Sequence, residues 1–280
     1  MSGIAPTLDC ACDGRHLRLA FSYDRPPAGE VRFAFAGAYR RLYRQCALCH
    51  HYFSSHAMDM TALYAGPYLD ATYGDAEGLR RNFARIVALP AAKSDNRGRV
   101  QRILEFAQGW PGLRRPPKLL DIGSGLAVFP HAMKGAGWDV TALDPDPRAA
   151  AHARDTVGVA AIAGDFMTVD PATLGRNDAI SFNKVLEHVE APTAMLARAA
   201  AFLNDGGFVY VELPDGEAAA VEGGEREEFF IDHHHVFSFA SVTLLAERAG
   251  FRAVTVERLR EPSGKYTLRA FLAAAPTGQP

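Results

Sequence analysis

The second half of the chain alternates short apolar runs with longer amphipathic stretches. Apolar runs over 118–122, 139–144, 159–165 and 178–183 each end at or beside a polar side chain. The segments between them are long enough for one helix each, and strands that alternate with helices are typical of a parallel sheet covered by helices. Because parallel strands end at one common edge, the polar side chains at their ends are expected to lie along that edge.

The first half of the chain has a different pattern. Short β-prone runs cover 17–21 and 31–35, whereas apolar positions at helical spacing predict helices between 59 and 109. A basic segment with two prolines, 114–118, ends the helical part and leads into the first run of the second half. We therefore divide the chain into a β-rich module over 1–56, a helical part over 57–115 and an α/β domain over 116–280.

A glycine motif follows the first apolar run of the α/β domain. The run leads into Asp121, then Gly123 and Gly125, and then a helix-like segment. Glycine permits a sharp turn of the backbone and lets a ligand approach where a Cβ would collide. The interval from Gly123 to Asp144 equals that from Asp144 to Asp165, and each fits one helix plus one strand. The pattern predicts a nucleotide-sized pocket at the carboxyl end of the first strand.

These residues resemble the class I S-adenosylmethionine-dependent methyltransferases, a family with an α/β, Rossmann-like sheet of seven strands. The resemblance covers roughly residues 60–275 and implies that the helical part is a lid over the cofactor. It also implies that the runs 252–257 and 266–272 form an antiparallel pair that completes the sheet. In this family the loop of Asp121, Gly123 and Gly125 would lie beside the methionine part of S-adenosylmethionine.

The resemblance implies further cofactor contacts at the strand ends. Asp144 would hold the ribose hydroxyls, Asp165 would face the adenine amino group, and Phe166 would lie near the adenine ring. Asn183 would lie near the methyl donor, although an asparagine at this position can equally cap the helix that follows. Tyr73 would touch the methionine end of the cofactor from the lid, or else pack the lid with its hydroxyl group in water.

The same fold leaves a nicotinamide-dependent dehydrogenase as an alternative, since such enzymes also use a glycine loop followed by a ribose-binding acid. Their fingerprint puts a third glycine at the position of Val128, and Asp121 stands where they usually carry an apolar residue. The Gly-Asp pair at Asp165 has no role in binding a dinucleotide. The motif therefore favours a methyltransferase, with Ala127 in place of the third glycine common in that family.

All four cysteines lie near the amino end of the chain. In a reducing compartment, clustered cysteines indicate a metal more often than a disulfide, and a C-x-x-C spacing lets two thiolates chelate one Zn²⁺. With short β-prone runs between the pairs, the module over 1–56 resembles a zinc ribbon, with a structural Zn²⁺ held by four thiolates. The alternative is that these are ordinary buried thiols. The predicted ligands are Cys10, Cys12, Cys46 and Cys49.

Three histidines are candidates for the base that many methyl transfers need. Histidine suits this task near neutral pH. His233 and His235 stand in a segment, 232–238, that resembles the E-H-x-H-[YF]-F-S segment of many methyltransferases, and His188 follows the fourth strand. The first two could equally hold their loop through bonds to backbone carbonyls. The triple histidine could also bind a metal, although adjacent residues rarely chelate one ion together.

The expected reaction is methyl transfer to a small polar acceptor. Some proteins with a ribbon, this sheet and this histidine segment methylate nucleotide-linked sugars at carbon, while relatives methylate oxygen or nitrogen of small molecules, and the charged loop 217–228 is the expected specificity element. A hypothesis of another class is that the chain binds the cofactor or a partner without turnover. In that case the three candidate histidines would be dispensable while the glycine loop would remain necessary.

Composition narrows the partners further. The 280 residues carry a formal net charge of −2, which gives no electrostatic reason to expect nucleic acid. No apolar stretch reaches the roughly 18 residues needed to cross a bilayer, and the amino end has no signal-peptide pattern. We therefore expect a cytoplasmic protein with no membrane partner, and the sequence indicates no particular oligomeric state.

Overall fold

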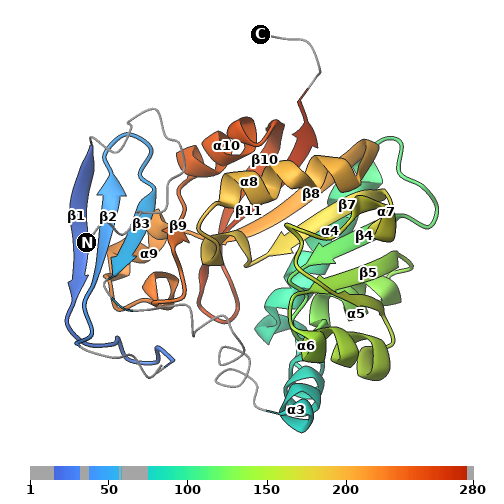
Figure 1. Ribbon diagram of the computed structural model, residues 1–280, viewed down its shortest axis with the longest axis horizontal. Helices are drawn as coiled ribbons and strands as arrows, with labels where there is room; N and C mark the ends of the chain where they lie inside the picture. Colours follow the sequence, from blue (N-terminus) through green and yellow to red (C-terminus); the bar gives the residue numbers. More distant parts are fainter. Residues whose placement is uncertain (1–15, 32–37, 57, 59–74, 276–280) are drawn as a thin grey trace.

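The structure is a computed structural model that describes residues 16–31, 38–56, 58 and 75–275. Its larger sheet has seven strands in the order β10-β11-β8-β7-β4-β5-β6 (Figure 1). β11 is antiparallel to both of its neighbours, β10 and β8. The neighbouring strands from β8 to β6 in this order are parallel to one another. The strands are β4 (Lys118–Ile122), β5 (Asp139–Asp144), β6 (Ala160–Ala163), β7 (Asn177–Asn183), β8 (Leu203–Pro214), β10 (Phe251–Arg260) and β11 (Tyr266–Ala274).

The predicted seven-stranded α/β sheet is confirmed. β5 has the bounds that the sequence predicts, and β10 and β11 form the predicted antiparallel pair. The third predicted run is shortened to four residues in β6, because the backbone leaves the sheet before Gly164. β8 begins at Leu203, so that residues 204–207, whose Asn-Asp-Gly-Gly sequence is typical of a turn, lie within the strand.

Helices cover both faces of this sheet. One face packs against α4 (Asp95–Gly109) and α5 (Val128–Gly135), the other against α8 (Pro192–Arg198) and α10 (Phe239–Arg248) (Figure 1). Odd and even strand residues therefore enter different apolar clusters: Leu119 packs on the α4 side and Leu120 on the α8 side. The other α-helices are α3 (Ala76–Val87), α6 (Pro147–His152), α7 (Pro171–Leu174) and α9 (Gly216–Glu222).

α4 belongs to the predicted lid, and the structure packs it on the sheet. Phe106 stacks on Phe271 of β11 with ring centroids 3.9 Å apart, and Ile103 is buried. Arg99 forms a buried ion pair with Glu212 of β8. Through these contacts α4 covers one face of the sheet, and a lid role for 57–115 stays a prediction. No helix in the described ranges is long and apolar enough to cross a membrane.

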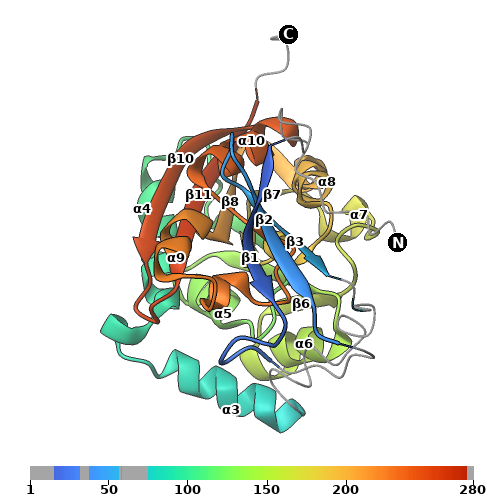
Figure 2. The same cartoon turned by 90° about the vertical axis from the view of Figure 1, so that its left-hand side faces the viewer.

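A second, smaller sheet is built from the amino-terminal module and one strand from near the carboxyl end. Its order is β1-β2-β3-β9 and its pairs are antiparallel. Figure 2 looks at this sheet from its own side, with the blue strands in front of the larger sheet. The strands are β1 (Leu17–Tyr23), β2 (Arg41–Cys46), β3 (Tyr52–His56) and β9 (His235–Val236).

A buried arginine ties the smaller sheet to the segment that precedes β9. Arg41 of β2 is 1% exposed, pairs with Glu30 at 3.0 Å and donates to the carbonyl of Phe229. The same oxygen of Glu30, Oε2, also accepts from the backbone N–H of Ile231 at 2.7 Å. Because a buried charge is costly unless it is paired, these bonds hold the 229–231 segment against the module.

The predicted zinc ligands are described in part. Cys46 ends β2 and Cys49 lies in the turn before β3, and both are buried against the core of the α/β domain. The turn is closed by the N–H of His50, which donates to the carbonyl of Cys46 at 2.9 Å. Cys10 and Cys12 lie outside the described residues, so the four-thiolate zinc site and the ribbon assignment stay predictions.

Candidate functional site

The glycine loop after β4 turns through three residues with left-handed backbone. Gly123 has φ of 69° and Gly125 of 50°, and the N–H of Gly123 donates to the carbonyl of Leu143 at 2.8 Å. A Cβ at Gly123 would lie 2.8 Å from Val185 Cγ2, whereas a Cβ at Gly125 would meet no atom of the described residues within 4 Å. Gly123 thus lets a neighbouring loop approach, and Gly125 has open space beside it among the described residues.

Ala127 is the third residue with left-handed backbone and stands at the beginning of α5. Its φ is 54°, and its side chain is fully buried. For a residue with a Cβ this conformation costs about 1 kcal/mol. This cost gives a physical reason for the glycine that is common at this position in the methyltransferases that the sequence resembles. The left-handed backbone of Ala127 could not be seen in the sequence.

Asp121 is buried near the carboxyl end of β4, beside the glycine loop. Its Oδ1 accepts from Ser181 Oγ at 2.6 Å and from Asn183 Nδ2 at 2.8 Å. Burial raises the pKa of Asp121 to about 6, although these hydrogen bonds act in the opposite direction. Asn183 Oδ1 is buried and accepts no hydrogen bond from the described residues. The site therefore presents a buried carboxylate and an unsatisfied carbonyl oxygen, which together suit a positively charged donor.

Asp144 links the end of β5 to the glycine loop. Its Oδ2 accepts from the N–H of Gly125 at 2.8 Å and its Oδ1 from the N–H of Asp146 at 2.9 Å. Burial raises the pKa of Asp144, and the two backbone donors oppose that effect. The carboxylate is thus held in one orientation beside the open space at Gly125.

Asp165 and Phe166 follow β6 and differ in exposure. Asp165 is exposed and accepts from the N–H of Met167 at 2.9 Å. Phe166 is buried in the core, with its ring centroid 5.1 Å from that of Phe202 and 5.6 Å from that of Phe182. Asp165 is thus open to solvent at the end of β6, whereas Phe166 is 3% exposed and packs in the core. Their adenine contacts stay predictions.

A second group of side chains lies beyond β7, beside the glycine loop. His188 ends the short 3₁₀ turn Leu186–His188, and its ring centroid lies 4.9 Å from that of His233. Nδ1 of His188 donates to the carbonyl of Asp232 at 2.9 Å, and Nδ1 of His233 to the carbonyl of Glu228 at 2.8 Å. Burial lowers the pKa of His233. The structure thus brings together two of the three predicted histidines.

His235 has a different environment. It is fully buried, its Nε2 donates to the carbonyl of Glu190 at 3.3 Å, and its Nδ1 accepts from Nε2 of His51 at 2.9 Å. The other nitrogen of His51 lies 3.1 Å from Ser241 Oγ. Burial lowers the pKa of His235 to about 3. Both of its ring nitrogens are used inside the fold, so the structure does not place it with His188.

Several residues of the edge were outside the sequence prediction. Ser181 contacts Asp121, and its position two residues before Asn183 puts both on one side of β7, which was a usable signal. Lys184 has a left-handed φ of 59°, and its ammonium donates to Thr267 Oγ1 at 2.9 Å. That partner lies on β11, and no local pattern could have indicated it. Tyr73 lies outside the described residues.

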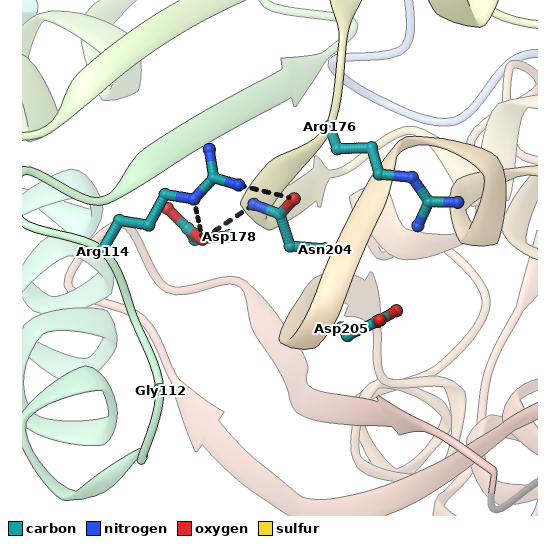
Figure 3. Close-up of a pocket in the computed structure, with 6 residues that line it drawn as sticks. All are labelled: Gly112, Arg114, Arg176, Asp178, Asn204 and Asp205. Carbon is teal, nitrogen blue, oxygen red and sulfur yellow. Dashed lines mark hydrogen bonds and ion pairs between the residues drawn. The ribbon is translucent and has the colours of Figure 1, made fainter.

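A surface hollow lies at the opposite edge of the sheet, where β7 begins (Figure 3). Arg114 points to Asp178 and Asn204, with Arg114 Nε 3.8 Å from Asp178 Oδ1 and Asn204 Nδ2 donating to the same oxygen at 2.8 Å (Figure 3). Asp178 Oδ2 accepts from the N–H of Lys118. These groups satisfy one another and fasten the beginning of β4, which indicates a structural role.

The strand order, the glycine loop and the acidic strand ends define a Rossmann-like protein of the class I methyltransferase type. Residues 92–256 match the family model described as "Methyltransferase domain", and the chain belongs to this family. The prediction of a class I S-adenosylmethionine-dependent methyltransferase is therefore confirmed as to family and fold. The match favours this class over the nicotinamide-dependent alternative.

The curated relatives share part of the chain. The ubiquinone biosynthesis O-methyltransferase of Bordetella avium (strain 197N) is 29% identical over 112 residues, which are 38% of this chain and 46% of that protein. The protein of the same name from Thiobacillus denitrificans (strain ATCC 25259 / T1) is 29% identical over 109 residues, covering 36% and 47%. The chain thus spans about half the length of the curated relatives it matches.

Solved structures share the fold. Magnesium protoporphyrin IX methyltransferase from Synechocystis PCC 6803 with bound SAH has a TM-score of 0.55 at 15% identity, covering 78% of this chain and 100% of that one. The 1,6-didemethyltoxoflavin-N1-methyltransferase of Burkholderia thailandensis has a TM-score of 0.56 at 19% identity, covering 82% and 96%. At such identities the likeness establishes the arrangement of the sheet and its helices.

Proposed function

We propose that the protein transfers a methyl group from S-adenosylmethionine to a small polar acceptor whose proton is removed at the His188–His233 pair. The observation that supports this is the contact between the two halves of the site. The side chain of Val185 lies against Gly123, and His188 follows Val185 within one turn. A cofactor over the glycine loop and an acceptor at the histidines would therefore be neighbours, as an in-line transfer requires.

The residues of the edge fit the cofactor. Asp121 and the unsatisfied Oδ1 of Asn183 can accept from the amino group of its methionine part, and Asp144 can accept from ribose hydroxyls. The open space at Gly125 leaves room for a ligand against the backbone. When bound, S-adenosylmethionine supplies an electrophilic methyl group on a sulfonium.

His188 is the base in this proposal. Its Nδ1 donates to a backbone carbonyl, so the proton is on Nδ1 and Nε2 is the basic nitrogen. The carboxylate of Asp232 lies 3.7 Å from Nδ1 and would stabilise the imidazolium that forms when Nε2 takes the acceptor proton. His233 packs edge-on against His188 and holds its orientation. His235 takes no part in proton transfer here.

The acceptor is proposed to be a small molecule that offers a hydroxyl group. The curated relatives are named as O-methyltransferases, which favours oxygen over nitrogen or carbon as the methylated atom. A sugar or a nucleotide-linked sugar remains a candidate acceptor beside a hydroxylated ring. The charged segment 217–228, which includes α9, would contribute to the choice.

The first test is calorimetric titration with S-adenosylmethionine, S-adenosylhomocysteine and NAD. We expect the first two to bind and NAD to be silent. Asp144→Ala should weaken binding about 10- to 100-fold, because hydrogen bonds to a charged group contribute about 1.5–3 kcal/mol. Asp139→Ala is the matched control: it changes an exposed carboxylate at the other end of β5 and should leave affinity unchanged. Binding of NAD alone would overturn the proposal.

Turnover is tested separately from binding. Transfer of labelled methyl groups from S-adenosylmethionine is measured over a panel of hydroxylated aromatic compounds, sugars and nucleotide-linked sugars. Cofactor binding without transfer to any of them, and with unchanged affinity in His188→Ala, would support the alternative that the protein binds the cofactor without catalysis.

A further inference from the structure

Three side chains from two distant segments converge beyond β7. An oxygen of Glu187 and one nitrogen each of His188 and His233 all lie within 4.8 Å of one another. The first two residues are adjacent in the 3₁₀ turn after β7, and the third belongs to the segment that leads into β9. Long-range packing, including the bond from the N–H of His234 to the carbonyl of Glu187 at 2.8 Å, holds the two segments together.

The two imidazoles have the tautomer that a metal ion requires. Each Nδ1 faces a backbone carbonyl, that of Asp232 for His188 and that of Glu228 for His233. A carbonyl can only accept, so each Nδ1 carries its proton and each Nε2 has the lone pair. A ligating histidine that donates its other N–H to a carbonyl or carboxylate is the usual arrangement around protein-bound metals.

Glu187 supplies the independent sign of a missing ligand. Its side chain is fully buried, and neither carboxylate oxygen has a hydrogen-bond partner among the described residues. A buried carboxylate is costly unless it is paired, hydrogen-bonded or coordinated to a metal. One of its oxygens is among the atoms within 4.8 Å of the two histidine nitrogens, so this carboxylate without a hydrogen bond is directed into the cluster.

We propose that Glu187, His188 and His233 bind one divalent transition-metal ion. Metal–nitrogen and metal–oxygen bonds of about 2.0–2.2 Å place ligand atoms about 3–3.5 Å apart, so the side chains must rotate to bring the three atoms closer together. Two imidazoles with one carboxylate favour Zn²⁺, Fe²⁺ or Mn²⁺ over Mg²⁺ and Ca²⁺, which prefer oxygen ligands alone. Three protein ligands leave positions open, and the partial exposure of His188 directs these positions outward.

This inference rests on the proposed function for the place of the acceptor, and it changes how the acceptor is activated. A metal ion lowers the pKa of a bound hydroxyl group, so in the metal-loaded protein the acceptor would lose its proton to solvent water while the two histidines hold the ion. In the metal-free protein His188 would take the proton itself. The metal site would select acceptors with two neighbouring oxygen donors, because such a molecule can occupy two open positions.

The test is titration of the full chain with Co²⁺, followed by optical absorption. Co²⁺ replaces the other divalent ions in such sites, and coordination by thiolates adds intense charge-transfer bands that nitrogen and oxygen ligands lack. We expect one ion bound without these bands, in addition to any ion at the predicted cysteine site. Glu187→Gln and His233→Gln should weaken this binding by at least tenfold.

His50→Gln is the matched control, because His50 also pairs with a glutamate, Glu217 at 2.9 Å, but is largely exposed and away from the cluster. It should bind the ion as the wild type does. Circular dichroism on every sample shows that each variant is folded, and S-adenosylhomocysteine affinity is measured on the same samples. His188→Gln, on a partly exposed ring, replaces any variant that fails to fold.

The outcomes separate this inference from the proposed function. Absence of the band-free ion in the wild type, or wild-type affinity in Glu187→Gln and His233→Gln, would overturn the metal site. Ion binding that depends on these residues in a protein that does not bind S-adenosylhomocysteine would support the metal site while the proposed function fails. A second expected result is a rise in Tm on adding Co²⁺ in the wild type that is lost in Glu187→Gln.

Discussion

Two histidine pairs that share one short segment differ in what surrounds their nitrogens. His188 and His233 each donate from Nδ1 to a backbone carbonyl, and the rings meet beside a buried carboxylate, Glu187. His51 and His235 bond to each other at 2.9 Å, and each has its second nitrogen at a further partner. Residues two apart would share one side of a regular strand, but β9 begins only at His235, and the turn that precedes it sends His233 into a different site. A histidine suited to chemistry is therefore distinguished from one suited to packing by the contacts of its ring nitrogens, and not by its position in the sequence motif.

The largest expected effect breaks the first pair. His188→Ala should lower the rate of methyl transfer by about 10²- to 10⁴-fold, the usual contribution of a general base, while S-adenosylhomocysteine affinity stays within about twofold. The rate is measured under saturating cofactor with the acceptor that the panel identifies. If His235→Ala lowers the rate of the folded protein equally, at unchanged acceptor KM, the distinction between the pairs is wrong.

The next effect breaks the second pair. His235→Ala should lower the free energy of unfolding by about 2–4 kcal/mol, because it removes a buried ring and leaves His51 without its acceptor. Urea unfolding followed by circular dichroism measures this change. His188→Ala, at a partly exposed position, should cost less than about 1 kcal/mol. Equal losses in the two variants would contradict the assignment of packing to one pair and chemistry to the other.

The pH dependence of the free energy of unfolding tests the burial of His235. His235 has its pKa lowered to about 3 by burial, and the unfolded chain has the ordinary value near 6.5, so the unfolded state binds more protons between these values. The stabilisation is complete above pH 6.5 and declines as the pH falls towards 3, by up to about 1.4 kcal/mol per pH unit for this residue. His235→Phe should flatten the dependence. An equally steep decline in that variant would assign the effect to other groups.

The smallest expected effect is a pH dependence of S-adenosylhomocysteine affinity at Asp121, which involves neither histidine pair. Burial raises the pKa of Asp121 to about 6. The ionised carboxylate of Asp121 binds the ammonium group of S-adenosylhomocysteine better than the protonated carboxyl does. The affinity for S-adenosylhomocysteine should therefore rise with pH up to about 6 and level off above it. Below that value we expect a loss of up to about tenfold per pH unit. Asp121→Asn should remove the dependence, whereas His235→Phe should leave it unchanged.

The arrangement of the glycine loop beside Asp144 could be predicted because the information for it is local. Asp121, Gly123 and Gly125 adjoin one strand, and the regular spacing to Asp144 follows from one helix and one strand in succession. The carboxylate of Asp144 does lie at the glycine loop, as its bond to Gly125 shows. Phe166 shows where such reasoning ends: its position in the motif was visible, but the packing of its ring on Phe182 and Phe202 depends on strands and helices elsewhere.

The histidine region could be predicted only as a set of candidates. His188, His233 and His235 were visible as residue types, and their separation into two environments depends on which carbonyls and rings lie nearby in space. The partner of His235 is His51, in the amino-terminal module, and no periodicity connects the two. The module itself was predicted as a unit on its own, whereas the structure completes its sheet with β9.

That completion by β9 has a consequence for synthesis of the chain. Tyr52 pairs with Val236 and Phe53 with His235, so the small sheet lacks its fourth strand until the chain has left the ribosome as far as residue 236. Contacts so distant along the chain form late and slowly, and an unpaired strand edge can meanwhile join another chain. The amino-terminal module should therefore be the last part to gain protection from hydrogen exchange during refolding, and shortened chains that end before β9 should be prone to aggregate.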